Sequence, residues 1–289
     1  MRILILGGDG MLGHQLLDYY QEKYDVKVTL RRDLSDYQQY NRFDRSNTYP
    51  GIDVRSQSGL IEVFSDFQPQ VVINAVGIVK QRSDSKEAIP SIEINALLPH
   101  RLALLCEMQS VRLVHLSTDC VFSGHKGSYV ESDYPDAKDL YGRTKLLGEV
   151  EGPGAITLRT SIIGLELARK KSLIEWFLSQ KGTIKGYSNA IYSGFTTLEM
   201  AKIIEHVVLN KPDMSGVWHV ASSPISKYEL LRTLSSLLSR DDIEIVKDED
   251  FICDRSLNAD RFNNTAEYSP PSWDHMMKEL AQQIRERME

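Results

Sequence analysis

Three glycines with a regular spacing constrain the fold of this chain more than any other feature. Gly7, Gly10 and Gly13 form a GxxGxxG pattern that directly follows the apolar run 3–6 and opens a helical pattern over 11–20. A strand that turns this tightly into a helix leaves no room for side chains, and the backbone N–H groups at the helix N-terminus can then bind a pyrophosphate. The pattern predicts a dinucleotide-binding turn formed by Gly7, Gly10, Met11, Leu12 and Gly13.

The rhythm that follows this turn predicts a parallel sheet. Short apolar runs at 2–6, 26–30, 70–74, 112–117 and 155–159 alternate with helical patterns at 11–20, 60–67, 92–109 and 141–151. Continuously apolar strands separated by helices are typical of a parallel sheet that helices cover on both faces. The expected fold class is α/β, a Rossmann-type doubly wound parallel sheet with a smaller mixed α/β C-terminal substrate domain.

The pattern changes after about residue 163. Helical patterns occur at 173–179, 196–209, 226–239 and 274–289, a short strand pattern at 217–220, and an acid-rich turn and strand at 241–250. Ser226 and Glu229 have the spacing of a capping box at a helix start. We expect 1–163 to form the dinucleotide-binding domain, with a return of about 187–215 to it, and 164–186 with 216–289 to form the substrate-binding domain.

Composition argues against several classes of function. The chain has 34 Lys and Arg against 40 Asp and Glu and no basic block that could follow a nucleic-acid backbone, so a nucleic-acid partner is not expected. The chain has no run of about 18 apolar residues, so a membrane partner is not expected. Three separated cysteines and seven histidines without ligand spacing predict neither a disulfide framework nor a metal site. The first apolar run is too short for a signal-peptide core, so we expect a cytoplasmic protein, and a homodimer is left open.

The residues after the second strand predict the type of dinucleotide. An acidic side chain at this position binds the ribose 2′-hydroxyl of NAD, whereas an arginine suits the 2′-phosphate of NADP. Arg31 and Arg32 therefore favour NADP(H), and Asp33 keeps NAD(H) open. Asp53 and Val54, which precede the next helical pattern, are expected beside the adenine.

The third strand ends in a turn of small residues. Ligands bind at the carboxyl ends of strands in open α/β sheets. Asn74, Ala75, Val76 and Gly77 are therefore expected to let the backbone approach the cofactor ribose. His115, inside the following strand, is expected to be a core residue.

The residues that carry reactive groups lie further along the chain. The fourth strand ends in Thr118, and Tyr141 precedes Lys145 by one helical turn, which places the tyrosine and the lysine on one helix face. A free tyrosine has a pKa of about 10 and is a poor acid at neutral pH, but a lysine cation one turn away favours the phenolate. Tuning of this kind is what a general acid requires. We predict Thr118, Tyr141 and Lys145 as the catalytic set.

Together these motifs resemble a known group of enzymes. The glycine turn, the turn after Asn74 and the Tyr-xxx-Lys spacing resemble the extended short-chain dehydrogenases/reductases. The segments 116–122 (LSTDCVF), 141–149 (YGRTKLLGE), 158–160 (LRT), 193–197 (SGFTT) and 216–220 (GVWHV) resemble the dTDP-4-dehydrorhamnose reductases. The similarity covers nearly the whole chain and is weakest at 165–185 and 240–289.

The resemblance implies a role for each matching residue. Tyr141 would donate a proton to the 4-keto oxygen of a nucleotide-linked 6-deoxy sugar, Thr118 would hydrogen-bond the same oxygen, and NADPH would deliver hydride to C4. Lys145 would bind the nicotinamide ribose and tune Tyr141, and Asn95 would act on the cofactor side as a structural or proton-relay asparagine. The implied substrate-binding residues are Thr118, Asp119, Val121, Phe122, Tyr141, Arg255 and Arg261. The two arginines would clamp the diphosphate, unless they are surface residues.

Departures from the group's pattern leave alternatives open. The turn at residue 74 reads Asn-Ala-Val-Gly where the group often has Asn-Ala-Ala, and 254–262 only partly matches the group's C-terminal segment. A UDP-linked 4-keto-6-deoxy-N-acetylhexosamine is therefore the alternative substrate. An epimerase or dehydratase of the same superfamily is a second alternative, although Cys120 follows Asp119 where a dehydratase usually has glutamate. A non-catalytic NADP-binding regulatory subunit, like the methionine adenosyltransferase β subunit, is a third.

Overall fold

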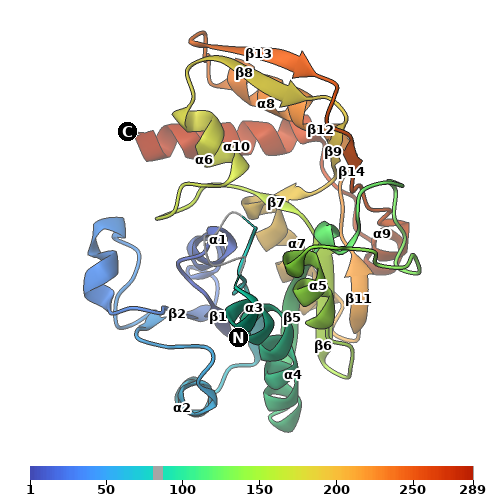
Figure 1. Cartoon of the computed structure of the whole chain (residues 1–289). Helices are drawn as coiled ribbons and strands as arrows, with labels where there is room; N and C mark the ends of the chain where they lie inside the picture. The colour runs from blue at the N-terminus through green and yellow to red at the C-terminus, as the bar shows by residue number, and fades with distance from the viewer. Residues whose placement is uncertain (81–86, 289) are drawn as a thin grey trace. The chain divides into compact units, whose positions relative to one another are not determined.

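Seven strands form the central sheet, in the order β11-β6-β5-β4-β1-β2-β3 (Figure 1). They are β1 (Arg2–Leu6), β2 (Asp25–Thr29), β3 (Thr48–Tyr49), β4 (Val71–Asn74), β5 (Arg112–Thr118), β6 (Ala155–Thr160) and β11 (Gly216–His219). The pairs β2–β3, β1–β2, β1–β4 and β4–β5 are parallel. The chain runs outward from β1 to β3 on one side and from β4 to β6 on the other, so the topological switch point lies between β1 and β4. This confirms the predicted doubly wound sheet and locates the edge at which such folds bind ligands.

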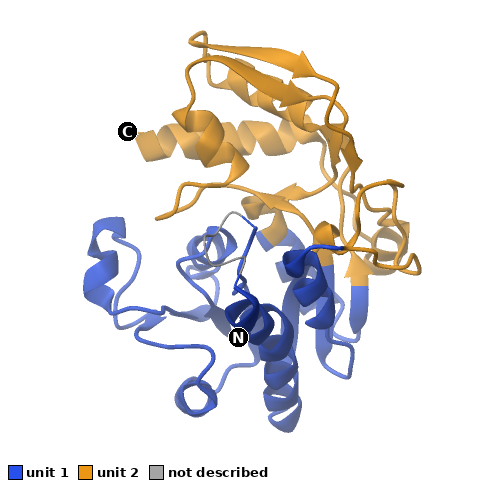
Figure 2. Cartoon of the chain, in the orientation of Figure 1, with its two compact units in different colours: residues 1–117, 138–158, 201–217 blue, residues 118–137, 159–200, 218–289 orange. Residues whose placement is uncertain are grey.

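The structure is a computed structural model that describes residues 1–80 and 87–288. In it the chain divides into two units (Figure 2). The first unit holds 1–117, 138–158 and 201–217, and the second holds 118–137, 159–200 and 218–289. This division differs from the expected one chiefly in two segments: 118–137 belongs to the second unit, and the return to the first unit covers 201–217, so that 187–200 also belongs to the second unit. Inside that unit the amide of Ser128 donates to Ser256 Oγ at 2.8 Å, and Tyr129 bridges to Leu257. Contacts between segments more than a hundred residues apart leave no local pattern in the sequence.

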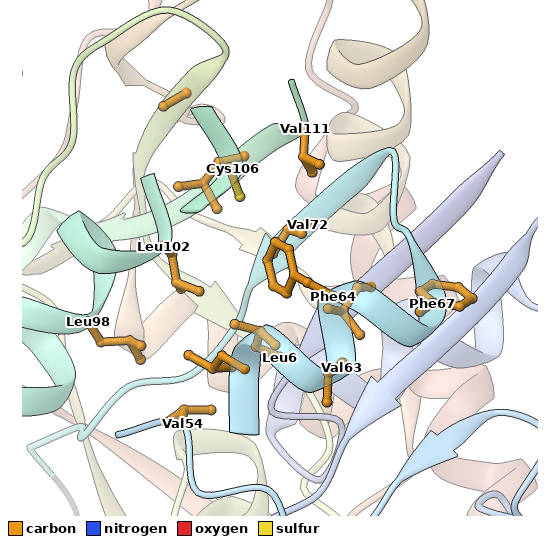
Figure 3. Packing of buried hydrophobic residues seen from close by; sticks show 14 of the residues in the cluster. Leu6, Val54, Val63, Phe64, Phe67, Val72, Leu98, Leu102, Cys106 and Val111 are labelled. Carbon is orange, nitrogen blue, oxygen red and sulfur yellow. The ribbon is translucent and has the colours of Figure 1, made fainter. Parts of the chain in front are cut away.

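The sheet of the first unit is covered by helices on both faces. On one face α2 (Gln57–Phe67) and α4 (Leu98–Met108) pack against strand residues such as Leu6 and Val72, with Phe64 of α2 in the middle of the cluster (Figure 3). α1 (Met11–Tyr20) packs against β1 and β2. The Tyr20 hydroxyl donates to the carbonyl of Ala201 in α7 (Thr197–Asn210) at 2.8 Å, which joins α1 to the part of α7 in this unit. Alternation along β1 directs successive side chains to these two helix layers.

Two helix boundaries differ from the sequence prediction. The single helix expected over 92–109 is a continuous stretch of α3 (Ala88–Ser91), a π-helical turn η3 (Ile92–Leu97) and α4. The helix expected to reach residue 151 is α5 (Leu140–Leu147), which ends at Gly148. A Cβ at Gly148 would overlap the carbonyl oxygen of Asn95, so helix α5 ends where its backbone meets the π-helical turn. Such turns often mark functional sites, and this one carries Asn95.

The second unit has its own core and three small sheets. α6 (Leu173–Ser179), α8 (Lys227–Leu237) and α10 (Trp273–Met288) contribute to a buried apolar cluster that includes Phe177, Leu234 and Leu280. The paired strands are β8 (Gly182–Tyr187) with β13 (Ile243–Asp248), β9 (Ala190–Tyr192) with β12 (Ile225–Ser226) and β14 (Cys253–Asp254), and β7 (Ile162–Ile163) with β10 (Phe195–Thr196). The remaining short elements are η1 (Leu34–Tyr40), η4 (Asp119–Val121) and α9 (Asp260–Ala266). The predicted capping box of Ser226 and Glu229 opens α8 and is confirmed.

Truncation of Phe64 tests the core of the first unit. Phe64 is fully buried, whereas Ile61 on the same helix is 45% exposed. Phe64→Ala is expected to lower the free energy of unfolding by about 3–5 kcal/mol, because it removes buried apolar atoms and leaves a cavity. Ile61→Ala, the matched control, is expected to cost less than about 1 kcal/mol. Urea unfolding measures both, and equal losses in the two variants would contradict this assignment of the core.

Candidate active site

The glycine turn after β1 forms a bare cradle. Gly7 has a φ of 85°, and an added Cβ there would lie 2.9 Å from Val76 Cγ2. A Cβ at Gly13 would overlap the carbonyl oxygen of Gly7. Helix α1 begins after Gly10 with no side-chain cap and no acidic residue in its first turn, so its N-terminal N–H groups face no carboxylate of their own helix. A dinucleotide pyrophosphate fits a turn of this kind, because backbone N–H groups and the helix dipole both favour an anion.

The segment after β2 exposes two arginines beside this turn. Arg31, Arg32 and Asp33 are all exposed. The chain then folds back, and the Tyr37 hydroxyl donates to Asp9 Oδ2 in the glycine turn at 3.2 Å. Burial and the nearby Asp9 carboxylate raise the pKa of Tyr37 to about 12, so this contact persists at all ordinary pH values. An arginine after the second strand of such a sheet suits the 2′-phosphate of NADP, and this role of Arg31 and Arg32 stays a prediction.

Asp53 and Val54 fit an adenine contact less well. The Asp53 carboxylate pairs with Arg55 at 2.5 Å, and this partner lowers its pKa. Val54 is buried in the apolar cluster under α2 and α4. Their expected place beside the adenine stays a prediction.

The turn after β4 is fixed by two buried amides. Asn74 Oδ1 accepts from the Val76 amide at 3.2 Å, which closes the turn on itself. Asn95, from η3, accepts from the Ile78 amide and donates to the Ile78 carbonyl, both at 2.9 Å. The Asn95 amide also donates to Thr144 Oγ1 at 3.3 Å. Asn95 therefore joins the cofactor turn to α5, the helix that carries Tyr141 and Lys145.

Lys145 is a buried cation on α5 whose side chain contacts the end of β5. It is 5% exposed, and its Nζ donates to the Leu116 carbonyl at 2.6 Å. Burial lowers the pKa of Lys145 to about 8, and the Glu149 carboxylate opposes this shift only in part. Glu149 itself accepts from Ser117 Oγ at 2.6 Å. At neutral pH the lysine is still mostly charged, so a positive charge is available one turn from Tyr141.

Tyr141 is partly exposed and has a second cation nearby. Lys80 Nζ lies 5.8 Å from the centre of the Tyr141 ring and pairs with Asp139 at 2.8 Å. Asp139 also caps α5 by accepting from the Gly142 amide at 2.9 Å. The same carboxylate thus caps the start of α5 and holds Lys80 near the tyrosine. Lys145 carries the other positive charge on this side of the unit, one helical turn after Tyr141.

The other predicted residues belong to the second unit. Thr118 Oγ1 accepts from the Cys120 amide at 3.2 Å and lies 3.1 Å from Asp119 Oδ1, to which it donates. Asp119 is 7% exposed, and burial raises its pKa despite the nearby Arg255. Val121 and Phe122 are fully buried, and Phe122 stacks on Tyr129 at 4.2 Å.

Both candidate arginines for the diphosphate have protein partners. Arg255 donates from Nε to the Phe122 carbonyl at 2.9 Å and from Nη2 to the Ser123 carbonyl at 3.2 Å. Arg261 stacks over Trp218, 3.7 Å from the ring centre. These contacts hold the guanidinium groups in place but also occupy part of their donor capacity. A diphosphate clamp at these positions stays a prediction.

The structure also shows residues that the sequence analysis missed. Lys80 lies near the Tyr141 ring, Thr144 accepts from Asn95, and the Glu149 carboxylate acts electrostatically on Lys145. Each lies within or a few residues from a recognised motif. His115 was expected to be an ordinary core residue, yet it hydrogen-bonds Asn74 at 3.1 Å. Within the described part of the chain, no group of three His, Cys, Asp or Glu side chains could hold a metal ion, and no helix is long and apolar enough to cross a membrane.

Comparison with known proteins places this geometry in a family. The family described as RmlD substrate binding domain matches residues 1–285. The chain belongs to this family. It is 26% identical over 245 residues to a dTDP-4-dehydrorhamnose reductase of Aggregatibacter actinomycetemcomitans, covering 79% of this chain and 76% of that protein.

The chain is also similar to a protein with a different name and to a solved structure. The chain is 28% identical over 176 residues to methionine adenosyltransferase 2 subunit beta of Bos taurus, covering 58% of this chain and 48% of that protein. A solved structure of dTDP-4-dehydrorhamnose reductase from Bacillus anthracis in complex with NADP has the same fold, with a TM-score of 0.76 and 20% identity, covering 98% of this chain and 99% of that one.

Replacing Lys145 tests the cost of its buried charge. The unfolded chain keeps this proton up to a pKa of about 10.5, whereas the folded protein releases it above about 8. The unfolded state therefore binds more protons between these values, so stability rises with pH in this window and the full cost is present below it. The shift corresponds to about 3 kcal/mol, from which about 1 kcal/mol is subtracted for the lost hydrogen bond. Lys145→Met is expected to stabilise the cofactor-free protein by about 2 kcal/mol at pH 7.

Chemical denaturation at pH 7 and pH 10 measures this effect. The exposed Lys138 provides the control Lys138→Met, which is expected to change stability little at either pH. The gain from Lys145→Met should shrink at pH 10, since the wild-type lysine is then neutral in the folded protein. A less stable Lys145→Met variant at pH 7 would show that the buried charge is better compensated than its contacts indicate.

Proposed function

We propose that this chain is an NADPH-dependent reductase of the 4-keto group of a nucleotide-linked 6-deoxy sugar. The observation that carries the proposal is Lys145, a nearly fully buried cation one helical turn from Tyr141. Asn95 connects this helix to the turn at the switch point of the sheet. A cation one helical turn from a tyrosine, on a helix that Asn95 joins to the turn after β4, matches the needs of carbonyl reduction. We place this activity in the cytoplasm, as the sequence predicts.

The residues around the cradle support NADP(H) as the cofactor. Gly7, Gly10 and Gly13 accommodate the pyrophosphate, and the exposed Arg31 and Arg32 suit a 2′-phosphate. The Bacillus anthracis reductase with the same fold was solved with NADP. When bound, the nicotinamide would supply hydride to C4 of the sugar.

The protein supplies the proton that completes the reduction. Tyr141 donates its phenolic proton to the 4-keto oxygen, so the carbonyl gains one hydride at carbon and one proton at oxygen and becomes a hydroxyl. The phenolate that remains would be stabilised by the Lys145 cation one helical turn away until it takes up a proton from solvent. Thr118 hydrogen-bonds the same sugar oxygen in this proposal, as the family resemblance implies.

The relatives favour dTDP-4-dehydrorhamnose as the substrate. The Aggregatibacter relative carries that activity in its name, and a Streptomyces niveus relative, 27% identical over 252 residues, is named dTDP-4-keto-6-deoxy-D-glucose reductase. A UDP-linked 4-keto-6-deoxy-N-acetylhexosamine remains the alternative, because the segment 254–262 only partly matches the C-terminal segment of the dTDP-4-dehydrorhamnose reductases.

A regulatory role is the second candidate function. Similarity to the beta subunit of methionine adenosyltransferase 2 favours it, although that match spans about half of the relative. In such a role the chain would bind NADP(H) and a partner enzyme without turnover. An epimerase differs from both, because it would interconvert sugars without net consumption of NADPH.

Tyr141→Phe tests the proposed chemistry. NADPH oxidation is followed at pH 7 with freshly prepared dTDP-4-dehydrorhamnose or the UDP-linked sugar. Loss of the proton donor is expected to lower kcat by about 10²–10⁴-fold, with little change in the Kd for NADPH. Net NADPH oxidation by wild type with one sugar would identify the substrate. Retained turnover in Tyr141→Phe would refute Tyr141 as the acid, and NADPH binding without turnover of either sugar would favour the regulatory role.

Arg31 and Arg32 are tested by cofactor preference. The double variant Arg31→Ala/Arg32→Ala is expected to weaken NADPH binding by about tenfold or more and to leave NADH binding nearly unchanged, because only NADPH carries the 2′-phosphate. Arg45→Ala, at another exposed arginine, is the control. Fluorescence titration of both cofactors measures the Kd values. An equal loss for NADPH and NADH would show that these arginines do not read the phosphate.

A further inference from the structure

His115 is fully buried in β5 and faces the cofactor turn through one hydrogen bond. Its Nδ1 lies 3.1 Å from Asn74 Nδ2. Its other ring nitrogen, Nε2, is buried with no hydrogen-bond partner among the described residues. A residue that served only to fill the core would not need a polar ring in this position. The hydrogen bond to Asn74 therefore indicates what the polar ring does in this position.

The hydrogen-bond pattern fixes the protonation of this ring. Asn74 Oδ1 accepts from the Val76 amide, so Asn74 presents its N–H group to His115. His115 Nδ1 must then be an unprotonated acceptor, and the proton lies on Nε2. If the ring were charged, two N–H groups would face each other. Flipping the Asn74 amide would relieve that conflict but would turn its NH₂ group toward the Val76 N–H.

The surroundings keep the ring neutral. The charged groups that act on it are Lys145 on α5 and, when protonated, His100 on α4, and both oppose a second positive charge. Burial lowers the pKa of His115 well below its ordinary value, and this is the largest cause. The Glu149 carboxylate is engaged by Ser117, two residues further along β5. Neutral His115 is thus the stable form throughout the pH range in which the protein would work.

The Asn74 turn in turn contacts the glycine cradle. Val76 packs so closely on Gly7 that a Cβ at residue 7 would lie 2.9 Å from Val76 Cγ2. We propose that His115, as a neutral acceptor, is a positioning residue that holds the Asn74 amide in the one orientation that fastens Val76 against the cradle. This role rests on the proposed binding of NADPH at that turn. His115 would thus raise the affinity for NADPH through its hydrogen bond to Asn74, an effect that its packing in the core alone would not produce.

Two variants separate positioning from packing. His115→Asn keeps a side-chain oxygen close to the place of Nδ1, whereas His115→Leu removes the acceptor and fills the core with apolar atoms. The Kd for NADPH is expected to rise about tenfold in His115→Leu and to stay within about threefold of wild type in His115→Asn. Thermal unfolding is expected to rank them in the opposite order, with His115→Asn the less stable, because the smaller polar side chain leaves a cavity.

Hydrogen exchange provides a readout that does not depend on the cofactor. In His115→Leu the amides of 74–78 are expected to exchange faster than in wild type, since the Asn74 side chain is no longer held, and His115→Asn should restore protection. Unchanged exchange and unchanged Kd in His115→Leu would overturn the proposal, as would affinities that follow the stability ranking. If wild type binds no NADPH, the proposed function fails, and the exchange data alone decide whether His115 positions the turn.

Discussion

The close contact of two turns at the switch point of the sheet is the constraint on which the candidate site depends. β1 and β4 pair in parallel with Leu6 opposite Asn74, so the glycine turn and the Asn74 turn begin at the same level of the sheet. The Ala75 amide donates to the Leu6 carbonyl at 3.1 Å, which extends the pairing into the turns. Only glycine at residue 7 combines the positive φ with the space that Val76 leaves. The cradle is therefore shaped by a neighbouring strand as much as by its own sequence.

Buried polar side chains hold this region together, at some cost in stability. The Asn74 and Asn95 amides are well paired, and pairing offsets the cost of burying them. The Lys145 charge and the His115 Nε2 are not compensated to the same extent. A buried N–H without a partner costs about 1–3 kcal/mol, and the total stability of a folded domain is only about 5–15 kcal/mol. Apolar residues at these two positions would suit stability better, so the polar ones point to a requirement other than folding.

Most of the correct predictions of the fold came from patterns within short stretches of the sequence. The strands and helices of the doubly wound sheet have strong periodicity, and the glycine turn and the Tyr-xxx-Lys spacing are short motifs. The end of α5 at Gly148 was missed because it depends on the Asn95 carbonyl, about fifty residues away in sequence. The role of Asn95 and the contact of His115 with Asn74 likewise join different elements, and nothing in their immediate sequence shows it. The short strands β9, β10 and β14 have too few residues for a periodic signal.

The same energetics help to separate a catalyst from a cofactor-binding subunit. A subunit that only held NADP(H) would need the cradle, the arginines after β2, the Asn74 turn and a lysine for the nicotinamide ribose, but it would not need a tyrosine one helical turn before that lysine. Lys145 is nearly fully buried, its pKa is lowered to about 8, and its Nζ has a backbone carbonyl as its hydrogen-bond partner. A methionine of similar length would fill this space without a buried charge. In the proposed reductase the lysine has a second task besides the ribose, because its positive charge would stabilise a phenolate one turn away after Tyr141 gives up its proton. The combination of a buried charge with a tyrosine one turn away is thus what the proposed reductase needs and what a cofactor-binding subunit would not need.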